Sequence, residues 1–499
     1  MILAYFLALA ICFALKVRRR CVCPGSVRSC CYTCIVSREK FVYKSLIPAP
    51  AKEVFNWHKR AGAFERLAPP WVDLKILNRQ GGIEDGAFVE LAISNGPITI
   101  KWTLEHKDYV EGRQFCDYQV EGPFAFWEQV HRVEPESDNS CYLQDTVEYE
   151  LPAGGLGDLA GGRIIHHELE NLFKFRHRTL IQDIVYAKEA NIRPIRVLVT
   201  GSTGLIGSAL VPYLTSQGHE VTRLLRNGSK ISDHDHNERI RWDPYEPKID
   251  TNRLEGYDAV VHLAGDNIGS ERWTDAKKKK LIYSRLKPTQ VLCQALNQLE
   301  RPPSVLISAS AIGIYGDRGV ENLVEESPSG EGFLADTCMQ WEAAARGVDP
   351  DIRLVNLRFG VVLSPKGGAL HKMLLPFQMG GGGPIGSGQQ FFSWIDIDDA
   401  LGAIFHSIIN GTVSGPVNAV SPYPVPNADF ARVLGKIVGR PALVPMPAFA
   451  ARAMFGQMAD ECLLASQKVL PGRLTETNYE FRYPYLEPSL RHVLGKLVD

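Results

Sequence analysis

The stretch IRVLVTGSTGLIG, residues 195–207, decides the fold of the second half of this 499-residue chain. A β-branched apolar run ends at Thr200, and three glycines at i, i+3 and i+6 precede an apolar-periodic helix. Gly201 permits a tight turn, Gly204 lets backbone N–H groups approach a phosphate, and Gly207 lets the helix pack on the strand. The stretch therefore predicts a strand, a turn and a helix N-terminus that bind the pyrophosphate of a dinucleotide.

The segments that follow alternate between strands and helices, which is typical of a parallel sheet. The second strand, from His219 to Leu225, ends at Arg226, nineteen residues after Gly207. A carboxylate at this place suits the ribose 2′-hydroxyl of NAD, whereas an arginine suits the 2′-phosphate of NADP. We therefore expect NADP as the cofactor in preference to NAD.

Size and composition limit the classes of function. A chain of 499 residues is long enough for two or three domains, each with its own core. Hydrophobic residues make up 45% and charged residues 22%, as in an ordinary globular protein. The net charge of −1 supplies no basic face, so we expect no nucleic-acid partner. The polar loop Asp233-His234-Asp235-His236 is interpreted as solvated, and no metal site is predicted.

Residues 1–39 form an apolar and cysteine-rich extension. Met1 to Leu15 is almost wholly apolar, basic residues follow from Lys16, and six of the eleven cysteines lie within the first 34 residues. A secretory signal would place its charges first, and a membrane-spanning helix needs about 20 apolar residues. We favour a dispensable extension, with membrane contact through residues 1–20 as the alternative. The remaining cysteines are scattered in apolar contexts, which predicts a cytoplasmic protein.

Residues 40–190 carry the pattern of a separate α+β domain. A strand-like run at 41–47 and short helical stretches precede six more runs, at 72–79, 86–94, 97–107, 113–120, 124–135 and 139–150. A long helix follows, whose predicted inner face comprises Ile165, Leu169, Leu172, the stem of Arg176, Leu180 and Ile184. This order resembles the START-like (SRPBCC) helix-grip fold, in which a curved sheet wraps a long helix.

The helix-grip resemblance implies a cavity, and with it an apolar ligand as a candidate partner. Its lining would come from some of Trp57, Phe64, Trp71, Trp102, Phe124, Phe126 and Trp127. The alternative is that these aromatic side chains fill the core of the domain, because aromatic residues dominate ordinary cores too.

The second half carries further motifs in a fixed order. They are His262-Leu263-Ala264-Gly265, Arg272-Trp273-Thr274, Ser284-Arg285, Ile314-Tyr315-Gly316-Asp317, Trp341-Glu342, Leu357-Arg358-x-Gly360-Val361-Val362-Leu363, the segment 382–388 and the segment 394–399. With the glycine turn, these motifs resemble the epimerase-family branch of the extended short-chain dehydrogenase/reductases. The resemblance implies a doubly wound Rossmann domain over residues 195–420 and a small helical cap over 421–499.

The resemblance also implies cofactor-binding residues. It assigns Gly201, Thr203, Gly204, Leu205, Ile206 and Gly207 to the cofactor turn. Arg226 would lie at the adenosine ribose, and Leu263 and Ala264 along the cofactor. Arg285 would lie near a phosphate or ribose, and Val362 beside the nicotinamide.

Catalytic residues are harder to assign. Extended short-chain dehydrogenases use a serine or threonine that orients the substrate oxygen, and a Tyr-x-x-x-Lys pair whose lysine lowers the pKa of the tyrosine. Ser310 stands near the serine position, and the spacing to Tyr315 is one residue longer than in typical epimerases. Residues 333–340, FLADTCMQ, contain neither tyrosine nor lysine, so the dyad is absent. Ser310, Tyr315 and Asp336 remain as candidate acid–base groups.

Three functions fit these observations. The first is an NADP-dependent oxidoreductase or epimerase that acts on an unknown small molecule. The second is an NADP-binding sensor without turnover, and the third is a carrier of an apolar ligand through residues 40–190. A retained cofactor site indicates binding more directly than turnover, so the substrate and the reaction stay open.

Overall fold

The computed structural model describes residues 38–152, 155–229, 235, 237–246 and 249–498. The chain divides into two compact units. Unit 1 is Met1–Glu189 together with Leu497–Asp499, and unit 2 is Ala190–Lys496. All but the last two residues of the predicted extension 1–39 lie outside the described residues, and so does the membrane contact predicted for residues 1–20. Within the described part of the chain, no helix is both long and apolar enough to cross a membrane.

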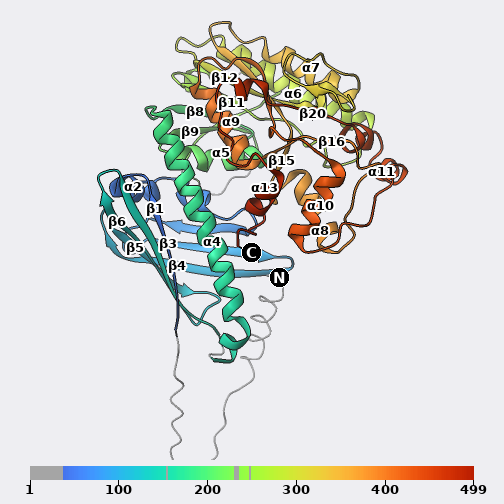
Figure 1. Ribbon diagram of the computed structural model, residues 1–499. Helices are drawn as coiled ribbons and strands as arrows, with labels where there is room; N and C mark the ends of the chain where they lie inside the picture. The colour runs from blue at the N-terminus through green and yellow to red at the C-terminus, as the bar shows by residue number, and fades with distance from the viewer. Residues whose placement is uncertain (1–37, 153–154, 230–234, 236, 247–248, 499) are drawn as a thin grey trace, which may run out of the picture. The chain divides into compact units, whose positions relative to one another are not determined.

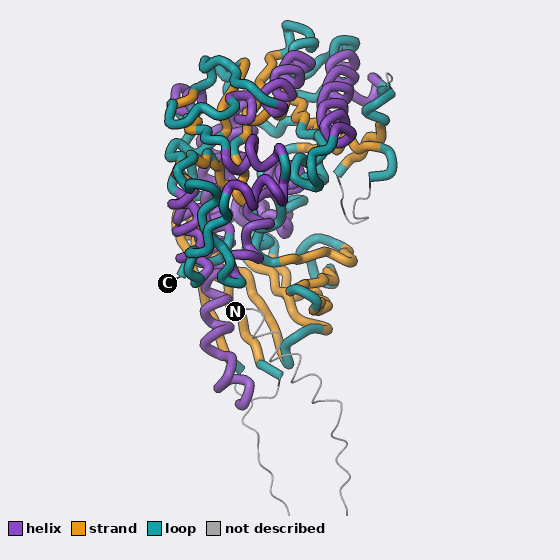
Figure 2. Tube along the Cα trace, turned by 90° about the vertical axis from the view of Figure 1, so that its right-hand side faces the viewer, coloured by secondary structure: helices purple, strands orange, loops and turns teal. Residues whose placement is uncertain are grey.

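Unit 1 is a seven-stranded antiparallel sheet that curves along one long helix, α4 (Figures 1 and 2). The strand order is β1-β7-β6-β5-β4-β3-β2. The strands are β1 (Glu39–Ile47), β2 (Asp73–Gln80), β3 (Phe88–Asn95), β4 (Ile98–Val110), β5 (Gln114–Glu121), β6 (Phe126–Ser137) and β7 (Ser140–Glu150). The helices are α2 (Ala51–Lys59), α3 (Ala63–Leu67) and α4 (Gly155–Ala190). All seven predicted strands of this domain are present.

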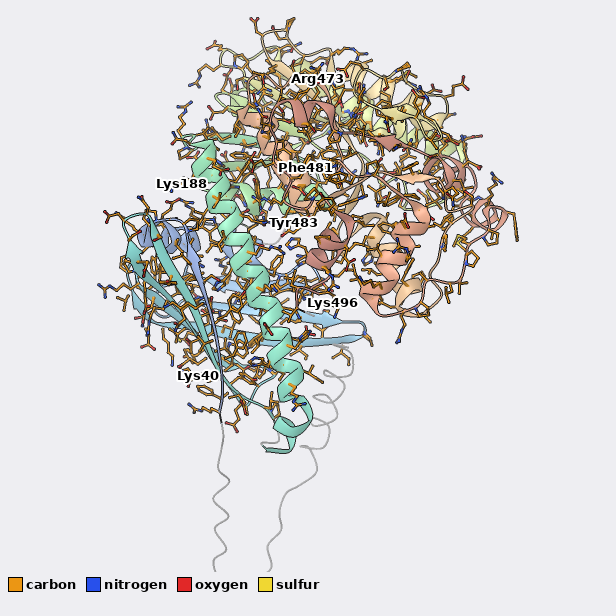
Figure 3. All side chains as sticks on the ribbon, in the orientation of Figure 1. Lys40, Lys188, Arg473, Phe481, Tyr483 and Lys496 are labelled. Carbon is orange, nitrogen blue, oxygen red and sulfur yellow. The ribbon has the colours of Figure 1, made fainter. Side chains whose placement is uncertain are left out.

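The predicted inner face of α4 is buried. Ile165, Leu169, Leu180 and Ile184 are each at most 6% exposed. Along β7 buried and half-buried residues alternate, as expected for a strand with one face on the core. Lys40, near the start of β1, and Lys188, near the end of α4, are labelled in Figure 3.

Several of the aromatic residues predicted to line a cavity pack against one another. Trp57 lies in one hydrophobic cluster and Trp127 in another. The ring centroids of Trp102 and Trp127 are 5.1 Å apart, and those of Phe124 and Trp127 are 4.8 Å apart. For these rings the packing favours the alternative interpretation, in which they fill the core.

Unit 2 is a seven-stranded parallel sheet with the order β10-β9-β8-β11-β12-β14-β18. The strands are β8 (Arg196–Thr200), β9 (Glu220–Arg226), β10 (Glu238–Trp242), β11 (Ala259–His262), β12 (Val305–Ala311), β14 (Arg353–Phe359) and β18 (Gly415–Ala419). β8 pairs on one side with β9 and on the other with β11, so the direction of winding reverses between β8 and β11. Ligands of open α/β sheets bind in the crevice at such a reversal.

Helices and short strand pairs complete unit 2. The helices are α5 (Leu205–Ser216), α6 (Asp275–Leu296), α7 (Phe333–Ala345), α8 (Gly368–Gln378), α9 (Ile397–Ile409), α10 (Asn427–Val438), α11 (Ala448–Phe455), α12 (Gly472–Glu476) and α13 (Leu486–Val493). The short pairs include β15 (Val361–Leu363) with β17 (Trp394–Asp396). The fold class predicted from the sequence, a helix-grip domain followed by a doubly wound domain, is confirmed.

The segment after residue 420 is fastened to α9 by a buried carboxylate. Asp399 accepts hydrogen bonds from the backbone N–H groups of Arg482, at 2.7 Å, and Tyr483, at 2.9 Å. Tyr483 and Phe481 are labelled in Figure 3. Burial raises the pKa of Asp399 to about 6, although these hydrogen bonds lower it. The carboxylate therefore holds the C-terminal segment against α9.

Candidate dinucleotide-binding site

The turn after β8 has a backbone that only glycine fits. Gly201 adopts φ +66°, in the left-handed region, and a Cβ there would lie 2.6 Å from the carbonyl carbon of Leu263. A Cβ at Gly207 would overlap the carbonyl oxygen of Gly201. A Cβ at Gly204 would meet only that same oxygen, at 3.3 Å, so the outer side of the turn is open. Two glycines thus close the turn, and the third leaves room for a ligand to approach the backbone.

The N-terminus of α5 faces this opening without a side-chain cap. Gly204 is the N-cap residue, and no side chain of the described residues accepts a hydrogen bond there. The first N–H groups of a helix have no partner within the helix and carry partial positive charge. The N–H groups of Leu205, Ile206 and Gly207 therefore suit phosphate oxygens, and Thr203 is exposed beside them.

The neighbouring strand β11 ends beside the turn. Its last residue, His262, pairs in register with Thr200, and the N–H of Leu263 donates to the carbonyl of Thr200 at 3.3 Å. Leu263 and Ala264 are half-buried as they leave the strand. The backbone of Leu263 therefore lies next to Gly201, and Ala264 follows it.

His262 connects β8 and α6 through hydrogen bonds of its buried side chain. Its ring nitrogens lie 2.7 Å from the hydroxyl of Thr200 and 2.9 Å from that of Thr289 on α6. Burial lowers the pKa of His262 to about 4, so the ring is neutral at pH 7. In the sequence His262 is only the last residue of a predicted strand, and nothing there shows that its partners lie on two other elements.

Two of the predicted cofactor-binding residues are the arginines Arg226 and Arg285. Arg226 is exposed at the end of β9, and its guanidinium forms no ion pair with any described residue. Arg285 donates to the backbone carbonyls of Leu281 and Asp266, both at 3.0 Å. Its pKa is lowered by burial, and no carboxylate among the described residues hydrogen-bonds to it. Both guanidinium groups therefore have charge available for an anion.

Val362 and the start of α8 lie near the first residue of α5. Val362 is 9% exposed on β15, and α8 begins six residues later. A Cβ at Gly367 or Gly368 would lie 3.3 Å from the side chain of Leu205. The start of α8 therefore packs against the first residue of α5, which brings Val362 and the glycine turn to the same region of unit 2.

Ser310 and Tyr315, the candidate catalytic residues, belong to a buried hydrogen-bond network. The hydroxyl of Ser310 donates to Glu342 at 2.8 Å, and Glu342 pairs with Arg358 at 2.8 Å. The Tyr315 hydroxyl donates to Asn418 at 2.7 Å and accepts from Arg358 at 2.8 Å. Tyr315 is fully buried, and burial raises the pKa of its phenol. Both hydroxyls thus already have partners within the protein.

Two other sequence interpretations involve charged residues of unit 2. Asp336 is exposed on α7. Most of the polar loop 233–236 lies outside the described residues, and Asp235 pairs with Arg223 at 2.7 Å. Neither observation tests a catalytic or metal-binding role.

Three sequence families match this chain. The NAD dependent epimerase/dehydratase family matches residues 197–419. A domain of unknown function (DUF1731) matches residues 446–493. The polyketide cyclase / dehydrase and lipid transport family matches residues 47–173.

Curated relatives match the second half of the chain. The human epimerase family protein SDR39U1 is 39% identical over 304 residues, which are 60% of this chain and 100% of the relative. A chloroplastic SDR39U1 homolog of Arabidopsis thaliana is 39% identical over 304 residues, 60% of this chain and 86% of the relative. The chain belongs to the epimerase family. The family resemblance of the sequence motifs is confirmed.

Solved structures match this epimerase family protein over one or both units. The nucleoside-diphosphate sugar epimerase of Corynebacterium glutamicum is 33% identical, with a TM-score of 0.74 that covers 91% of this chain and 90% of the other. Human SDR39U1 with NADPH is 37% identical, with a TM-score of 0.55 over 61% of this chain and 100% of the other. The first match extends the likeness beyond the Rossmann domain.

Proposed function

We propose that unit 2 binds NADP(H) in the crevice between β8 and β11 and uses it as an oxidoreductase or epimerase on a small molecule. The observation that carries the proposal is the turn at Gly201, where a side chain would strike the backbone of Leu263. Only a turn wound this closely leaves the N–H groups of α5 open to a pyrophosphate. The structure of human SDR39U1 with NADPH supports the choice of cofactor.

We assign each part of the cofactor to different residues of the crevice. We assign the pyrophosphate to the backbone of Gly201, Thr203, Gly204, Leu205, Ile206 and Gly207. Arg226 would bind the 2′-phosphate, which favours NADP over NAD, and Arg285 a phosphate or ribose oxygen. Leu263 and Ala264 would line the adenosine half, and Val362 the nicotinamide end. When bound, the nicotinamide supplies or accepts a hydride.

A nucleoside-diphosphate sugar is the substrate class that we propose to test first. The Corynebacterium glutamicum protein that matches 91% of this chain is described as a nucleoside-diphosphate sugar epimerase. Ser310 and Tyr315 remain the proposed acid–base groups for such a reaction. Proton transfer by either would require its present hydrogen bonds to rearrange, because both hydroxyls have partners within the protein.

Those same hydrogen bonds favour a second candidate function, binding of NADP(H) without turnover. In that case the occupancy of the crevice would regulate another part of the chain or a partner. One experiment separates the two functions. Purified protein is loaded with NADPH and mixed with a panel of nucleoside-diphosphate sugars and carbonyl compounds, while absorbance at 340 nm and sugar proton spectra are followed.

Oxidation of NADPH or formation of an epimer would establish turnover. Stable binding of NADPH with neither change across the panel would favour the sensor. Absence of NADPH binding would refute both functions.

For unit 1 we propose an apolar ligand. In support, residues 47–173 match the polyketide cyclase / dehydrase and lipid transport family. We also propose that the protein is cytoplasmic, because the five cysteines within the described residues are free thiols. A fluorescent fusion of the full chain tests the compartment.

A further inference from the structure

The inner face of the unit 1 sheet carries a row of ionisable side chains where an ordinary core would be apolar. The row crosses four neighbouring strands, β4 to β7, and its members pair across them: His106 with Asp117, and His131 with Asp145. His177 reaches the row from α4, and its Nε2 lies 2.6 Å from Asp145. Burying so many polar groups costs free energy, so the row calls for a physical explanation.

The two carboxylates of the row are satisfied by histidines. Asp117 lies 2.9 Å from His106 and 3.4 Å from His131. Asp145 pairs with His131, at 2.5 Å, and with His177. The pKa of each carboxyl is held below its ordinary value by these histidines, although burial acts in the opposite direction. Both carboxylates are therefore charged and already have hydrogen-bond donors.

Arg176 is the cation that these carboxylates leave without a partner. It lies one residue before His177 on α4, and its charge interacts with Asp145 and Asp117 without a hydrogen bond to either. Its Nε is buried and has no hydrogen-bond partner among the described residues. Its Cζ lies 5.7 Å from the ring centroid of Phe173, which is fully buried. Arg176 as a whole is half-buried, but a buried N–H donor such as its Nε is unfavourable without an acceptor unless a ligand supplies one.

Another arginine of unit 1, Arg66, has a guanidinium whose hydrogen-bond donors are paired. Arg66 donates to both carboxylate oxygens of Asp183, at 2.7 and 2.9 Å, and both residues are buried. Asp183 lies on α4, as Arg176 does. The same helix thus carries one closed ion pair and one arginine with unused donors. The difference argues against a purely structural role for Arg176.

The net charge of the row indicates the charge of a ligand that could bind there. The negative charges of Asp117 and Asp145 are balanced by Arg176 and by His131, whose pKa is raised to about 9 by Asp145 and Asp117. His58, which lies beside the row, is neutral at pH 7 because burial lowers its pKa to about 4. Protonation of any other histidine only adds positive charge. The interior is therefore neutral or positive, and suits one further negative charge.

We propose that unit 1 binds a monoanionic amphiphile, with the carboxylate of the ligand on Arg176 and its apolar body against the surrounding aromatic side chains. Phe173 lies beneath the guanidinium, and Phe115 stacks on His131 with ring centroids 4.2 Å apart. The proposal rests on the apolar ligand proposed above for unit 1 and adds its head group. A bidentate carboxylate would satisfy Arg176 as Asp183 satisfies Arg66.

A pair of probes that differ only in charge tests the head group. We would titrate the full chain with cis-parinaric acid and with its methyl ester at pH 7 and follow probe fluorescence. We expect the acid to bind at least about tenfold more tightly than the ester, the effect of one charge-assisted hydrogen-bonded pair. The preference should disappear in Arg176→Met and persist in Arg178→Met, a matched change at an exposed position of the same helix.

The outcomes distinguish failure of the anion site at Arg176 from failure of the apolar-ligand proposal for unit 1. Equal affinity for acid and ester in the wild type overturns the anion site but leaves the apolar ligand. Binding of neither probe overturns both. A preference that survives Arg176→Met places the carboxylate elsewhere and also refutes the inference. If that variant does not fold, Arg176→Ala and Arg176→Lys replace it, and only the lysine should keep a preference.

Discussion

The two units present opposite solutions to the binding of an anion. In unit 2 the donors are backbone N–H groups at the start of α5, exposed because Gly201 and Gly207 have no side chains. In unit 1 the charge comes from side chains on four strands and a helix, and the Nε of Arg176 is buried without an acceptor among the described residues. A backbone site is rigid and independent of pH, whereas a side-chain site depends on the ionisation of its neighbours. The two sites should therefore respond to different perturbations.

The largest effect is expected from Gly201→Ala. A methyl group there would lie 2.6 Å from the carbonyl carbon of Leu263 and force a left-handed φ on alanine. We expect the affinity for NADPH to fall by about a hundredfold or more, while binding of cis-parinaric acid to unit 1 is unchanged. Fluorescence titration measures both.

Gly228→Ala is the matched control for that variant. Gly228 has φ +79°, but a Cβ there meets no atom within 4 Å. The affinity of the Gly228→Ala variant for NADPH should stay within about twofold of the wild type. Backbone strain without a clash costs on the order of 1 kcal/mol of folding stability and does not close the turn at Gly201. Equal losses in both variants would mean that strain alone, and not the closure of the turn, governs binding.

Arg226→Glu is expected to change which nucleotide is preferred. The wild type should bind NADPH more tightly than NADH, and the variant should lose about ten- to a hundredfold in NADPH affinity, because a carboxylate repels the 2′-phosphate. Affinity for NADH should be kept. A wild type that binds both nucleotides equally would remove the role assigned to Arg226.

Tyr315→Phe tests whether the buried network is structural or catalytic. Removal of the hydroxyl leaves Arg358 and Asn418 each short of one hydrogen bond, so we expect about 1–3 kcal/mol less stability in urea unfolding. NADPH affinity should be unchanged. For any substrate found, a drop in kcat far larger than that of Asn418→Ala would assign the phenol to proton transfer.

A pH-dependent change in stability, of similar size, should separate the two units. The folded-state pKa of His131, about 9, lies above its ordinary 6.5, so its contribution is complete below pH 6.5 and is lost as the pH rises through about 9. His262 of unit 2 has the opposite shift, to about 4, and its contribution is lost as the pH falls from 6.5 towards 4. The charged and titratable side chains around His131 are Asp117, Asp145, His58, His106, His177 and Arg176.

Hydrogen exchange of peptides from each unit, corrected for the intrinsic rate, measures this difference. Unit 1 should lose on the order of 1–3 kcal/mol of protection between pH 6.5 and 9, and unit 2 should not. His131→Gln should abolish the alkaline loss. Equal behaviour of both units across this range would contradict the charge state assigned to the row.

The contrast between the units also explains what the sequence could predict. The glycine turn lies within thirteen consecutive residues, 195–207. The turn and its helix were predictable because the steric reason for each glycine is local. The strands of unit 1 were predictable for the same reason, since alternation and turn residues are local signals. The inner face of α4 followed from its helical period.

The interior of unit 1 was not predictable, because its meaning depends on register. His106 and His177 are 71 positions apart, and only the pairing of β4 to β7 and the packing of α4 bring them to Asp117 and Asp145. Arg176 was expected to place only its stem on the buried face. Its lack of an acceptor is a property of the assembled domain and leaves no trace in the sequence.

Lys277 in unit 2 is another residue whose contacts depend on the tertiary fold and could not be predicted from the sequence. A run of four lysines on a helix predicts a solvated face, yet Lys277 is 3% exposed. Its ammonium group donates to Asp266 at 2.6 Å and to Ser270 at 2.8 Å. Lys277 departs from this tendency because its acceptors, Asp266 and Ser270, lie in the loop before the helix and contact its ammonium group.

The central claim, that the crevice between β8 and β11 binds NADP(H), is tested most directly by calorimetric titration of the purified chain with NADPH and NADH. We predict a saturable heat for one molecule of NADPH per chain, with weaker binding of NADH. No heat of association with either nucleotide at millimolar concentration would contradict the claim.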